Sequence, residues 1–266
     1  MTHKAAAYTI GVIGTGSMGS ALVRGLSAGL PASTQFQVFD KDPEQARALA
    51  SLDGSRITQV TELADLVTAC DPVVISVKPQ DMDSLLCSVA GYLRPGKAVI
   101  STAAGVTLAR LRNGAGASPK LYRIMPNLAV AVGEGVVALA SEDGTDGATV
   151  EGLRSLLSCL GSVEILSEEY FDAVTAVSGS GPAFLALVLE ALEDGAVRSG
   201  LARSVARVFV RQTALGTARM LMDTPGSAAE LKDKVTSPGG TTVAGLAVLE
   251  DRGVRGALLR AVPSAV

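Results

Sequence analysis

The sequence predicts an α/β domain with a doubly wound, mainly parallel sheet, followed by an all-α domain. Three observations predict this order. Short β-branched runs alternate with helical patterns as far as Leu166. These runs are apolar on both faces, which is typical of strands in a buried parallel sheet. After Ser167 only helical patterns remain, so we expect two domains, residues 1–166 and 167–266.

The expected elements follow from this alternation. Strands are expected at residues 8–13, 35–39, 73–77, 98–102, 121–125 and 136–139. Helices are expected at residues 21–28, 43–50, 168–200 with a break at 178–182, 202–222, 228–235 and 242–252. Asp42 directly precedes Pro43, which is the typical sequence of a capped helix start.

Composition restricts the partners and the location of the chain. The 266 residues carry a net charge of −3, which gives no support for nucleic-acid binding. Mean hydropathy is high at +0.37, but the apolar run 183–189 ends at Glu190 and is far shorter than the ~20 residues of a membrane span. We therefore expect no membrane span and extensive burial between subunits. No secretory pattern precedes the first strand, so a cytoplasmic location is expected.

Side chains that bind metals or act as bases near neutral pH are scarce. Cys70, Cys87 and Cys159 are scattered without metal-ligand spacing, so we expect reduced, mostly buried thiols and no metal site. The only histidine, His3, stands near the N-terminus and is not expected to be a general base. No lysine occurs between Glu168 and Met222, although the lysine base of a 3-hydroxyacid dehydrogenase would be expected there.

A glycine-rich turn follows the first expected strand and opens the first expected helix. It consists of Gly14, Thr15, Gly16, Ser17, Met18 and Gly19. In this context the first glycine permits a tight turn, the second lets the backbone approach a pyrophosphate, and the third allows close helix–strand packing. The helix N-terminus would present free N–H groups to the phosphates. The pattern predicts a Rossmann-type dinucleotide site.

The ends of the later strands supply further cofactor-binding candidates. Asp40 ends the second strand, where an acid binds a ribose 2′-hydroxyl and favours NADH, but Lys41 beside it could accept a 2′-phosphate, so both NADH and NADPH stay open. Ligands of a doubly wound sheet lie beyond the carboxyl ends of its strands. The other candidates at such ends are Val77, Lys78, Pro79, Ala103, Ala104 and Gly105, with Asn127 after the fifth strand.

The lack of a base favours a hydride acceptor that already carries its proton. A protonated imine is such an acceptor, and it needs positioning and a hydrogen bond to its nitrogen rather than a strong acid. The segment 237–242, Ser-Pro-Gly-Gly-Thr-Thr, offers hydroxyls and also N–H groups at a helix start that could bind a carboxylate. The residues alone are equally compatible with a capped helix start after a proline turn.

Several motifs together resemble pyrroline-5-carboxylate reductases. They are Ile13–Gly19, Val77-Lys78-Pro79, Ala103–Thr107, Met125-Pro126-Asn127, Val177–Ala183, Leu231-Lys232-Asp233 and Ser237–Thr242. They stand in the family's order, and the last of them is far more specific than the glycine turn. The resemblance implies reduction of 1-pyrroline-5-carboxylate to L-proline, the last step of proline biosynthesis, with NADPH or NADH.

The resemblance also implies an arrangement and residue roles. The helical domain would form an interleaved homodimer, and some members of the family build larger rings from such dimers. Thr242 would hydrogen-bond the ring nitrogen, with Ser237 beside it as the second catalytic candidate. The implied substrate-binding set is Gly239, Gly240, Thr241, Thr242, Ser180 and Asn127. By the same resemblance, the cofactor would be lined by Val77, Lys78, Pro79, Ala103 and Ala104.

Two other functions stay open at this point. A 3-hydroxyacid dehydrogenase or 6-phosphogluconate-type enzyme has the same architecture, but the missing lysine counts against it. A non-catalytic nucleotide-binding protein is disfavoured by the intact hydroxyls of residues 237–242. The chain departs from the resembled family at three places. The change at Ser17 is mild. Asp40-Lys41 affects the cofactor preference, and the short last helix affects higher assembly more than chemistry.

Overall fold

The computed structural model describes residues 8–266, which form two compact units. The first extends to Gly179 and the second covers Ser180–Val266. The boundary expected from the sequence lies earlier in the chain, between residues 166 and 167. His3 lies outside the described residues.

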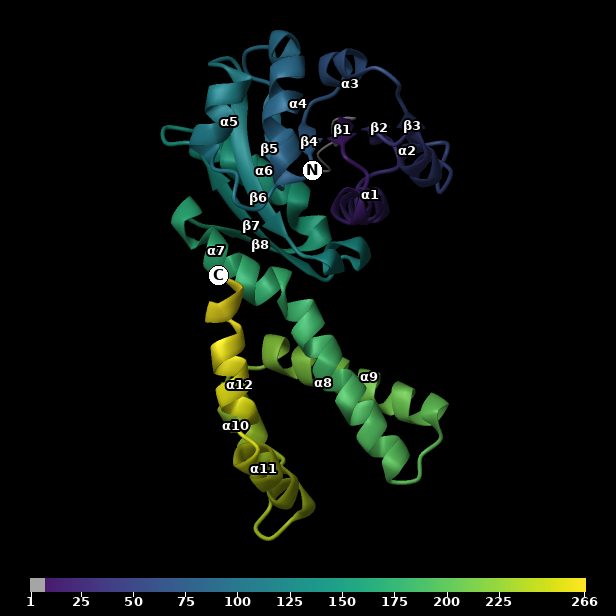
Figure 1. Cartoon of the computed structure of the whole chain (residues 1–266), viewed down its shortest axis with the longest axis vertical. Helices are drawn as coiled ribbons and strands as arrows, with labels where there is room; N and C mark the ends of the chain where they lie inside the picture. The colour runs from purple at the N-terminus through teal and green to yellow at the C-terminus, as the bar shows by residue number, and fades with distance from the viewer. Residues whose placement is uncertain (1–7) are drawn as a thin grey trace, which may run out of the picture. The chain divides into compact units, whose positions relative to one another are not determined.

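An eight-stranded sheet forms the centre of the first unit (Figure 1). Its order is β3-β2-β1-β4-β5-β6-β7-β8, and all neighbours are parallel except β6 and β7. The strands are β1 (Thr9–Ile13), β2 (Gln35–Phe39), β3 (Ile57–Gln59), β4 (Val73–Ile75), β5 (Ala98–Ser101), β6 (Lys120–Pro126), β7 (Gly135–Ser141) and β8 (Gly161–Ile165). This doubly wound, mainly parallel sheet confirms the predicted fold class.

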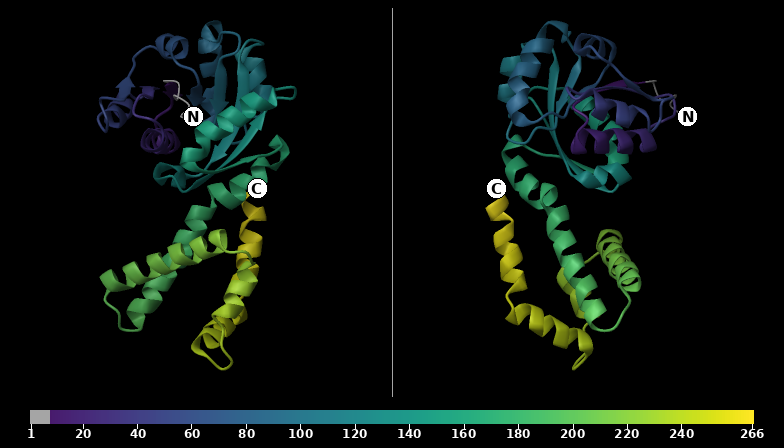
Figure 2. Two further views of the ribbon diagram at one scale, coloured as in Figure 1. Left: turned by 180° about the vertical axis from the view of Figure 1, so that it is seen from behind. Right: turned by 45° about the vertical axis from the view of Figure 1, so that its right-hand side comes forward.

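Helices cover both faces of this sheet (Figure 2). They are α1 (Ser17–Gly29), α2 (Pro43–Ala50), α3 (Leu63–Ala69), α4 (Met82–Val89), α5 (Leu108–Ala115) and α6 (Gly147–Leu157). One core cluster joins side chains of α1, α2 and α6 to the sheet, and the other joins those of α3, α4 and α5. Neighbours along a strand alternate between the clusters, so Val74 packs on one face and Val73 and Ile75 on the other.

The sequence patterns locate most of these elements. The strand at 35–39 and the helix at 43–50 have the expected bounds, and Asp42 caps α2 by accepting a hydrogen bond from the Glu44 amide. The strands β3 and β8 were not predicted, because each is short and carries polar or exposed residues. The expected strand 73–77 ends at Ile75, since Ser76 and Val77 leave the ladder before the 3₁₀ turn η1 (Pro79–Asp81).

A buried ion pair fixes the end of the first unit to the sheet. Arg123 of β6 is 4% exposed and donates to Glu168 Oε1 at 2.8 Å. The same oxygen accepts the Leu108 amide at the start of α5 at 2.8 Å. The guanidinium lies 4.7 Å from the ring centre of Phe171, in the short helix α7 (Phe171–Val174). One carboxylate therefore links a central strand, a helix start and the chain leading to the π-helical turn η6 (Thr175–Gly179).

The second unit is entirely helical. Its helices are α8 (Gly181–Arg198), α9 (Arg203–Asp223), α10 (Ala228–Lys234), α11 (Thr241–Asp251) and α12 (Val254–Ala261). Glu193 of α8 is held between two arginines of α9, at 3.5 Å from Arg207 and 3.3 Å from Arg211, which joins the two longest helices of the unit. The all-α character predicted for the C-terminal part is confirmed.

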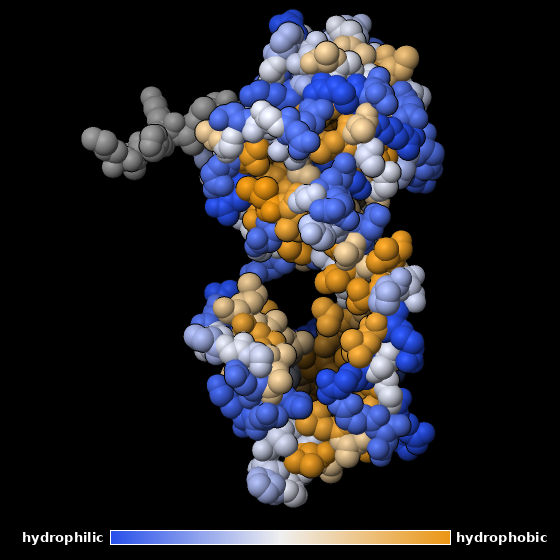
Figure 3. All heavy atoms as spheres, turned by 90° about the vertical axis from the view of Figure 1, so that its left-hand side faces the viewer, coloured by the Kyte–Doolittle hydropathy of each residue, from blue (hydrophilic) through white to orange (hydrophobic). Residues whose placement is uncertain are grey.

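Large apolar side chains lie open on the second unit (Figure 3). Those at least 60% exposed include Leu185, Leu187, Val208, Phe209, Leu215, Met222 and Leu259. Only Glu193 and Ala206 of this unit are buried. The continuous helical stretch Glu168–Arg198 is long and apolar enough to cross a membrane, and only 6% of its most apolar window is buried. Exposed apolar surface of this extent marks a binding or interaction face.

The substitution Glu168→Ala tests the ion pair at the end of the first unit. It leaves the buried Arg123 guanidinium without its carboxylate and the Leu108 amide without its acceptor. We expect a loss of about 3 kcal/mol in the free energy of unfolding, because a buried charge remains uncompensated. Chemical denaturation at one protein concentration measures it. The neighbouring Glu169→Ala removes an exposed carboxylate and should change stability by less than about 0.5 kcal/mol; equal effects of the two variants would contradict the assigned role.

Candidate active site

A cavity of about 470 Å³ lies beyond the carboxyl ends of β1, β2 and β4. Strand order reverses between β1 and β4. The strands β2 and β3 lie on one side of β1, and the strands β4 and β5 lie on its other side. Such a switch point is where doubly wound sheets bind their ligands. The lining residues are Ile13, Gly14, Gly16, Phe39, Asp40, Lys41, Gln45, Leu63, Ser76, Val77, Lys78, Asp81, Ser84, Leu85 and Ser88.

The three glycines of the turn have three different surroundings. Gly14 has a φ of +93°, and a Cβ there would overlap the Ser76 carbonyl of the β4 end. A Cβ on Gly19 would overlap the Gly14 carbonyl, so helix and turn are packed backbone to backbone. Gly16 has no atom within 4 Å of its Cβ position. Two glycines therefore build the turn, and the third leaves its backbone open to the cavity.

The start of α1 offers N–H groups at this opening. Gly16 is the N-cap residue and has no side chain to cap the helix. The Ser20 amide makes the first helical bond, to the Gly16 carbonyl at 2.9 Å, so the amides of residues 17–19 precede it. Together with the open face of Gly16, this cradle fits the pyrophosphate of a dinucleotide.

The carboxylate of Asp40 is bound to the glycine turn. Asp40 Oδ2 accepts the Thr15 amide at 2.6 Å and the Thr15 hydroxyl at 3.2 Å, while Oδ1 accepts the Asp42 amide at 3.0 Å. The carboxylate thus stands beside the phosphate-binding turn, where an adenosine ribose would lie.

The cation next to Asp40 is paired across the cavity. Lys41 Nζ lies 2.9 Å from Asp81 Oδ2 in η1. The hydrogen bond and charge of Asp81, with a smaller contribution from Asp40, raise the pKa of the exposed Lys41 ammonium above its ordinary value. Lys78 lines the same cavity, and within residues 8–266 its side chain forms no hydrogen bond or ion pair.

The cavity includes several of the residues predicted from the sequence. Gly14, Gly16, Asp40, Lys41, Val77 and Lys78 line it. Thr15, Ser17, Met18 and Gly19 belong to the turn or to the start of α1 without lining the cavity, and Pro79 begins η1. Residues 103–105 form the turn after β5. This turn begins next to the cavity, since the hydroxyl of the preceding residue, Thr102, donates to Oγ of the cavity residue Ser76 at 3.1 Å.

Sequence reasoning missed the contribution of α4. Asp81 precedes this helix, and Ser84, Leu85 and Ser88 of α4 line the cavity. A signal was present in the sequence, since Ser84 and Ser88 are spaced four apart and so lie on one face of a helix. The helix itself was not predicted, and without it these hydroxyls could not be placed.

The cysteines differ from one another in exposure. Cys70 is buried, and burial raises the pKa of its thiol to about 11, which keeps it protonated. Cys159 is half-buried and Cys87 is exposed, so the expectation of buried thiols is right for Cys70 and wrong for Cys87. Within residues 8–266 all three are free, and no group of three His, Cys, Asp or Glu side chains could hold a metal ion.

The second unit carries the segment 237–242 at the start of α11. Gly239 has a φ of +68°, and the Gly240 amide donates to the Ser237 carbonyl at 3.0 Å, which closes a turn. Gly240 is the N-cap residue of α11, and the first helical bond is donated by the Ala244 amide. The amides of residues 241–243 therefore precede the helical ladder, as an anion site requires.

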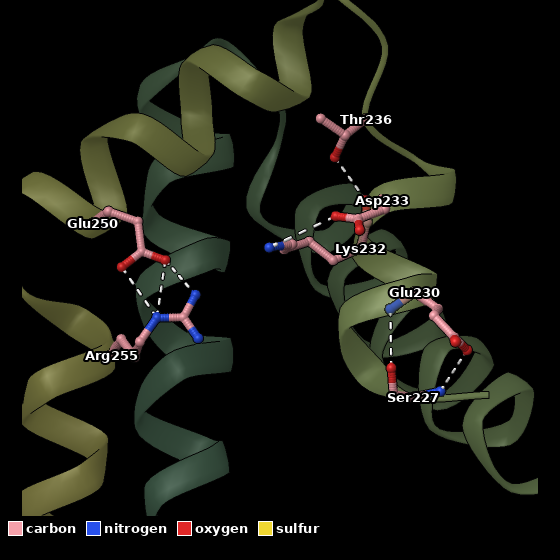
Figure 4. A network of polar contacts seen from close by, with 7 residues as sticks. All are labelled: Ser227, Glu230, Lys232, Asp233, Thr236, Glu250 and Arg255. Carbon is pink, nitrogen blue, oxygen red and sulfur yellow. Dashed lines mark hydrogen bonds and ion pairs between the residues drawn. The ribbon is translucent and has the colours of Figure 1, made fainter.

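A polar network holds the neighbouring part of the second unit (Figure 4). Ser227 and Glu230 form a reciprocal capping box at the start of α10. The Thr236 hydroxyl closes the end of α10 by donating to the Lys232 carbonyl at 2.6 Å. Residue 237 therefore follows a helix that is fixed at both ends.

Two predicted substrate residues lie at ends of other elements. Asn127 follows β6 and accepts the Val136 amide through Oδ1 at 3.3 Å, and its NH₂ group makes no hydrogen bond within residues 8–266. Ser180 is the N-cap residue of α8, directly after the π-helical turn. Turns of this kind inside helices are common at functional sites.

Comparison with known proteins identifies the family of this chain. The family model for pyrroline-5-carboxylate reductase dimerisation matches residues 168–266, and the model for coenzyme F420-dependent NADP oxidoreductases matches residues 9–105. The pyrroline-5-carboxylate reductase of Synechocystis is 38% identical over 257 residues, covering 96% of this chain and 95% of that protein. The chain belongs to the pyrroline-5-carboxylate reductase family. The resemblance seen in the sequence motifs is thereby confirmed.

Solved structures of this reductase family share the fold. The enzyme of Streptococcus pyogenes superposes with a TM-score of 0.85 at 32% identity, covering 97% of this chain and 96% of that one. The enzyme of Plasmodium falciparum, solved with NADP bound, gives a TM-score of 0.83 at 28% identity over 97% and 95% of the two chains.

The substitution Gly16→Ala tests the open position of the cradle. No atom lies within 4 Å of the new methyl group, so the free energy of unfolding should change by less than about 0.5 kcal/mol. A methyl group facing the pyrophosphate should weaken dinucleotide binding about tenfold, a cost of about 1.4 kcal/mol. Isothermal titration with NADH and NADPH measures this loss, and Gly91→Ala, also at an open glycine, is the matched control. Unchanged affinity would show that the pyrophosphate lies elsewhere.

Proposed function

We propose that this chain reduces 1-pyrroline-5-carboxylate to L-proline, the last step of proline biosynthesis, with a hydride from NADPH or NADH. The observation that carries the proposal is the family match along nearly the whole chain. In this proposal residues 1–166 hold the nucleotide, and residues 167–266 hold the substrate and the partner subunit. The steady-state rate with the imine and each cofactor tests it; tight nucleotide binding without imine turnover would overturn it.

The first unit supplies the cofactor site. The nicotinamide cofactor supplies the hydride when bound. The turn from Gly14 to Gly19 and the start of α1 would hold its pyrophosphate, and Asp40 or Lys41 would contact the adenosine ribose. Lys78 supplies a cation that has no carboxylate partner within residues 8–266. Val77, Pro79 and residues 103–105 would line the remaining length of the dinucleotide, beyond the ends of β4 and β5.

The second unit supplies the substrate site. The Thr241 amide, with the Ser237 hydroxyl, would hold the substrate carboxylate at the start of α11. The Gly240 amide, for which the resemblance implies the same role, already donates to the Ser237 carbonyl. The Thr242 hydroxyl would hydrogen-bond the ring nitrogen and keep the imine carbon facing the hydride donor. Gly239, Ser180 and Asn127 are the other proposed substrate-binding residues. No strong acid is needed, because a protonated imine accepts the hydride directly.

The two rival functions lack this support. A 3-hydroxyacid dehydrogenase needs a base to take the alcohol proton, and no lysine or histidine occurs between Glu168 and Met222. A non-catalytic nucleotide-binding protein needs neither the hydroxyls of residues 237–242 nor the free amides of residues 241–243. The relatives of Synechocystis and Escherichia coli, 38% and 34% identical over nearly the whole chain, carry the name of the reductase.

The protein is proposed to be a homodimer in the cytoplasm, with larger rings of dimers as a further assembly. The exposed apolar faces of α8 and α9 support the dimer, since a partner would remove them from water. The match to a dimerisation family model over residues 168–266 supports it as well. The same burial accounts for the apolar stretch Glu168–Arg198 without a membrane.

Thr242→Ala tests the contact with the ring nitrogen. We expect kcat to fall about 100-fold, because an unpositioned imine loses its alignment with the hydride donor, while the Kd for the cofactor stays unchanged. Thr242 is exposed at the first turn of α11, so alanine is tolerated there. Thr242→Ser should restore most of the rate, and Thr217→Ala on α9 is the matched control. A kcat that is unaffected in Thr242→Ala would remove this residue from the mechanism.

Leu187→Glu tests the proposed subunit interface. Leu187 is 67% exposed on α8, and a carboxylate buried there against a partner would be costly. We expect the dimer to dissociate, with Kd raised at least about 100-fold in sedimentation equilibrium. Leu52→Glu, at a 52% exposed leucine of the first unit, should leave the assembly unchanged. A Leu187→Glu protein that remains dimeric would place the interface on another face.

A further inference from the structure

The ion pair between Lys41 and Asp81 joins two loops at the mouth of the cavity. Lys41 follows β2, and Asp81 ends the 3₁₀ turn after β4, so residues far apart in the sequence meet there. Both line the same cavity as Gly14 and Gly16. Whatever nucleotide enters this cavity meets the charges of this pair.

The carboxylate of Asp81 is not used to build the fold. Asp81 is the N-cap residue of α4, but its side chain forms no capping hydrogen bond. Its carboxylate bonds to Lys41, whereas its own carbonyl accepts the Ser84 hydroxyl. The charge of Asp81 therefore acts on Lys41 and on the cavity rather than on the stability of α4.

Asp40 has a different position. Its carboxylate holds the Thr15 amide and hydroxyl and the Asp42 amide, so replacing it would also loosen the glycine turn. A change at Asp40 thus mixes a charge effect with a structural one. Asp81 offers the charge effect alone.

The two candidate cofactors differ by one phosphate group on the adenosine ribose, which carries a charge of about −1.5 to −2 at neutral pH. Among the cavity residues, Lys41 is the cation beside Asp40, where that ribose would lie. While Lys41 is paired with Asp81, its charge is largely offset, and the Asp81 carboxylate repels a second anion.

We propose that Asp81, acting through Lys41, is a positioning residue that sets the choice between NADH and NADPH and directs it toward NADH. The inference rests on the nucleotide site of the proposed function, not on the identity of the imine. The cavity holds the carboxylates of Asp40 and Asp81 and the ammonium groups of Lys41 and Lys78, whose charges balance. When the charge of Asp81 is removed, one positive charge remains in excess.

Asp81→Asn is the direct test. Asparagine keeps the size and the N-cap preference of aspartate, so α4 should be unaffected. The Kd for NADPH and for adenosine 2′,5′-bisphosphate should fall about fivefold, as expected for releasing one exposed cation. The Kd for NADH and for 5′-AMP should change by less than about twofold. The gain should shrink at high ionic strength, because the contact is exposed.

Three further variants separate charge from structure. Asp83→Asn removes a carboxylate two residues away that pairs with Arg110 outside the cavity, and it should leave both affinities unchanged. Asp81→Glu should keep the parent preference. The double variant Lys41→Ala with Asp81→Asn should lose the NADPH gain, since the released ammonium is absent. Thermal unfolding of each variant checks that it is folded.

Two results would overturn the inference: an unchanged NADPH to NADH affinity ratio in Asp81→Asn, or a gain that persists without Lys41. Binding is measured without the imine, so these results are independent of turnover. If the nucleotide affinities shift as expected but no imine is reduced, the proposed function fails and the selectivity assignment stands.

Discussion

The close packing of the glycine turn against the end of β4 is the constraint on which the nucleotide site depends. Gly14 is pressed against the Ser76 carbonyl and Gly19 against the Gly14 carbonyl, so neither position admits a side chain. This contact sets where α1 begins and therefore where its free amides point. It also brings the ends of β1 and β4 together at the reversal of strand order, which creates the cavity.

The second unit follows a different constraint. Five helices with only two buried residues cannot supply a hydrophobic core of their own. Their apolar faces become stabilising when another surface covers them, which links the stability of this unit to assembly. The segment 237–242 lies in this unit, so the proposed substrate contacts would depend on the proposed dimer that covers the helices.

Sequence patterns predicted an element where alternating apolar residues or a capping residue marked it. Strands such as 35–39 and the helix at 43–50 have clear patterns and capping residues, and their bounds are confirmed. The three-residue strand β3 and the polar strand β8 lack such patterns, because their pairing partners rather than their own residues make them strands. In the site, motif residues such as Gly14 and Lys78 were predicted, whereas Asp81 and Ser84 were not. The role of Asp81 arises from the meeting of two loops, which spacing along one chain does not encode, and Ser84 lies on helix α4, which was not predicted.

The charges at the cavity mouth show why a single residue type does not determine cofactor choice. An acid after β2 suggests NADH and a lysine beside it suggests NADPH, and the sequence offers both in Asp40 and Lys41. The structure resolves the two into different partners: Asp40 is bound to the turn and Lys41 to Asp81. A cation compensated by a nearby carboxylate attracts a dianion far less than a free one does. The cofactor preference therefore depends on the balance of charge across both loops. The decisive carboxylate, that of Asp81, lies forty residues after Lys41 in the sequence.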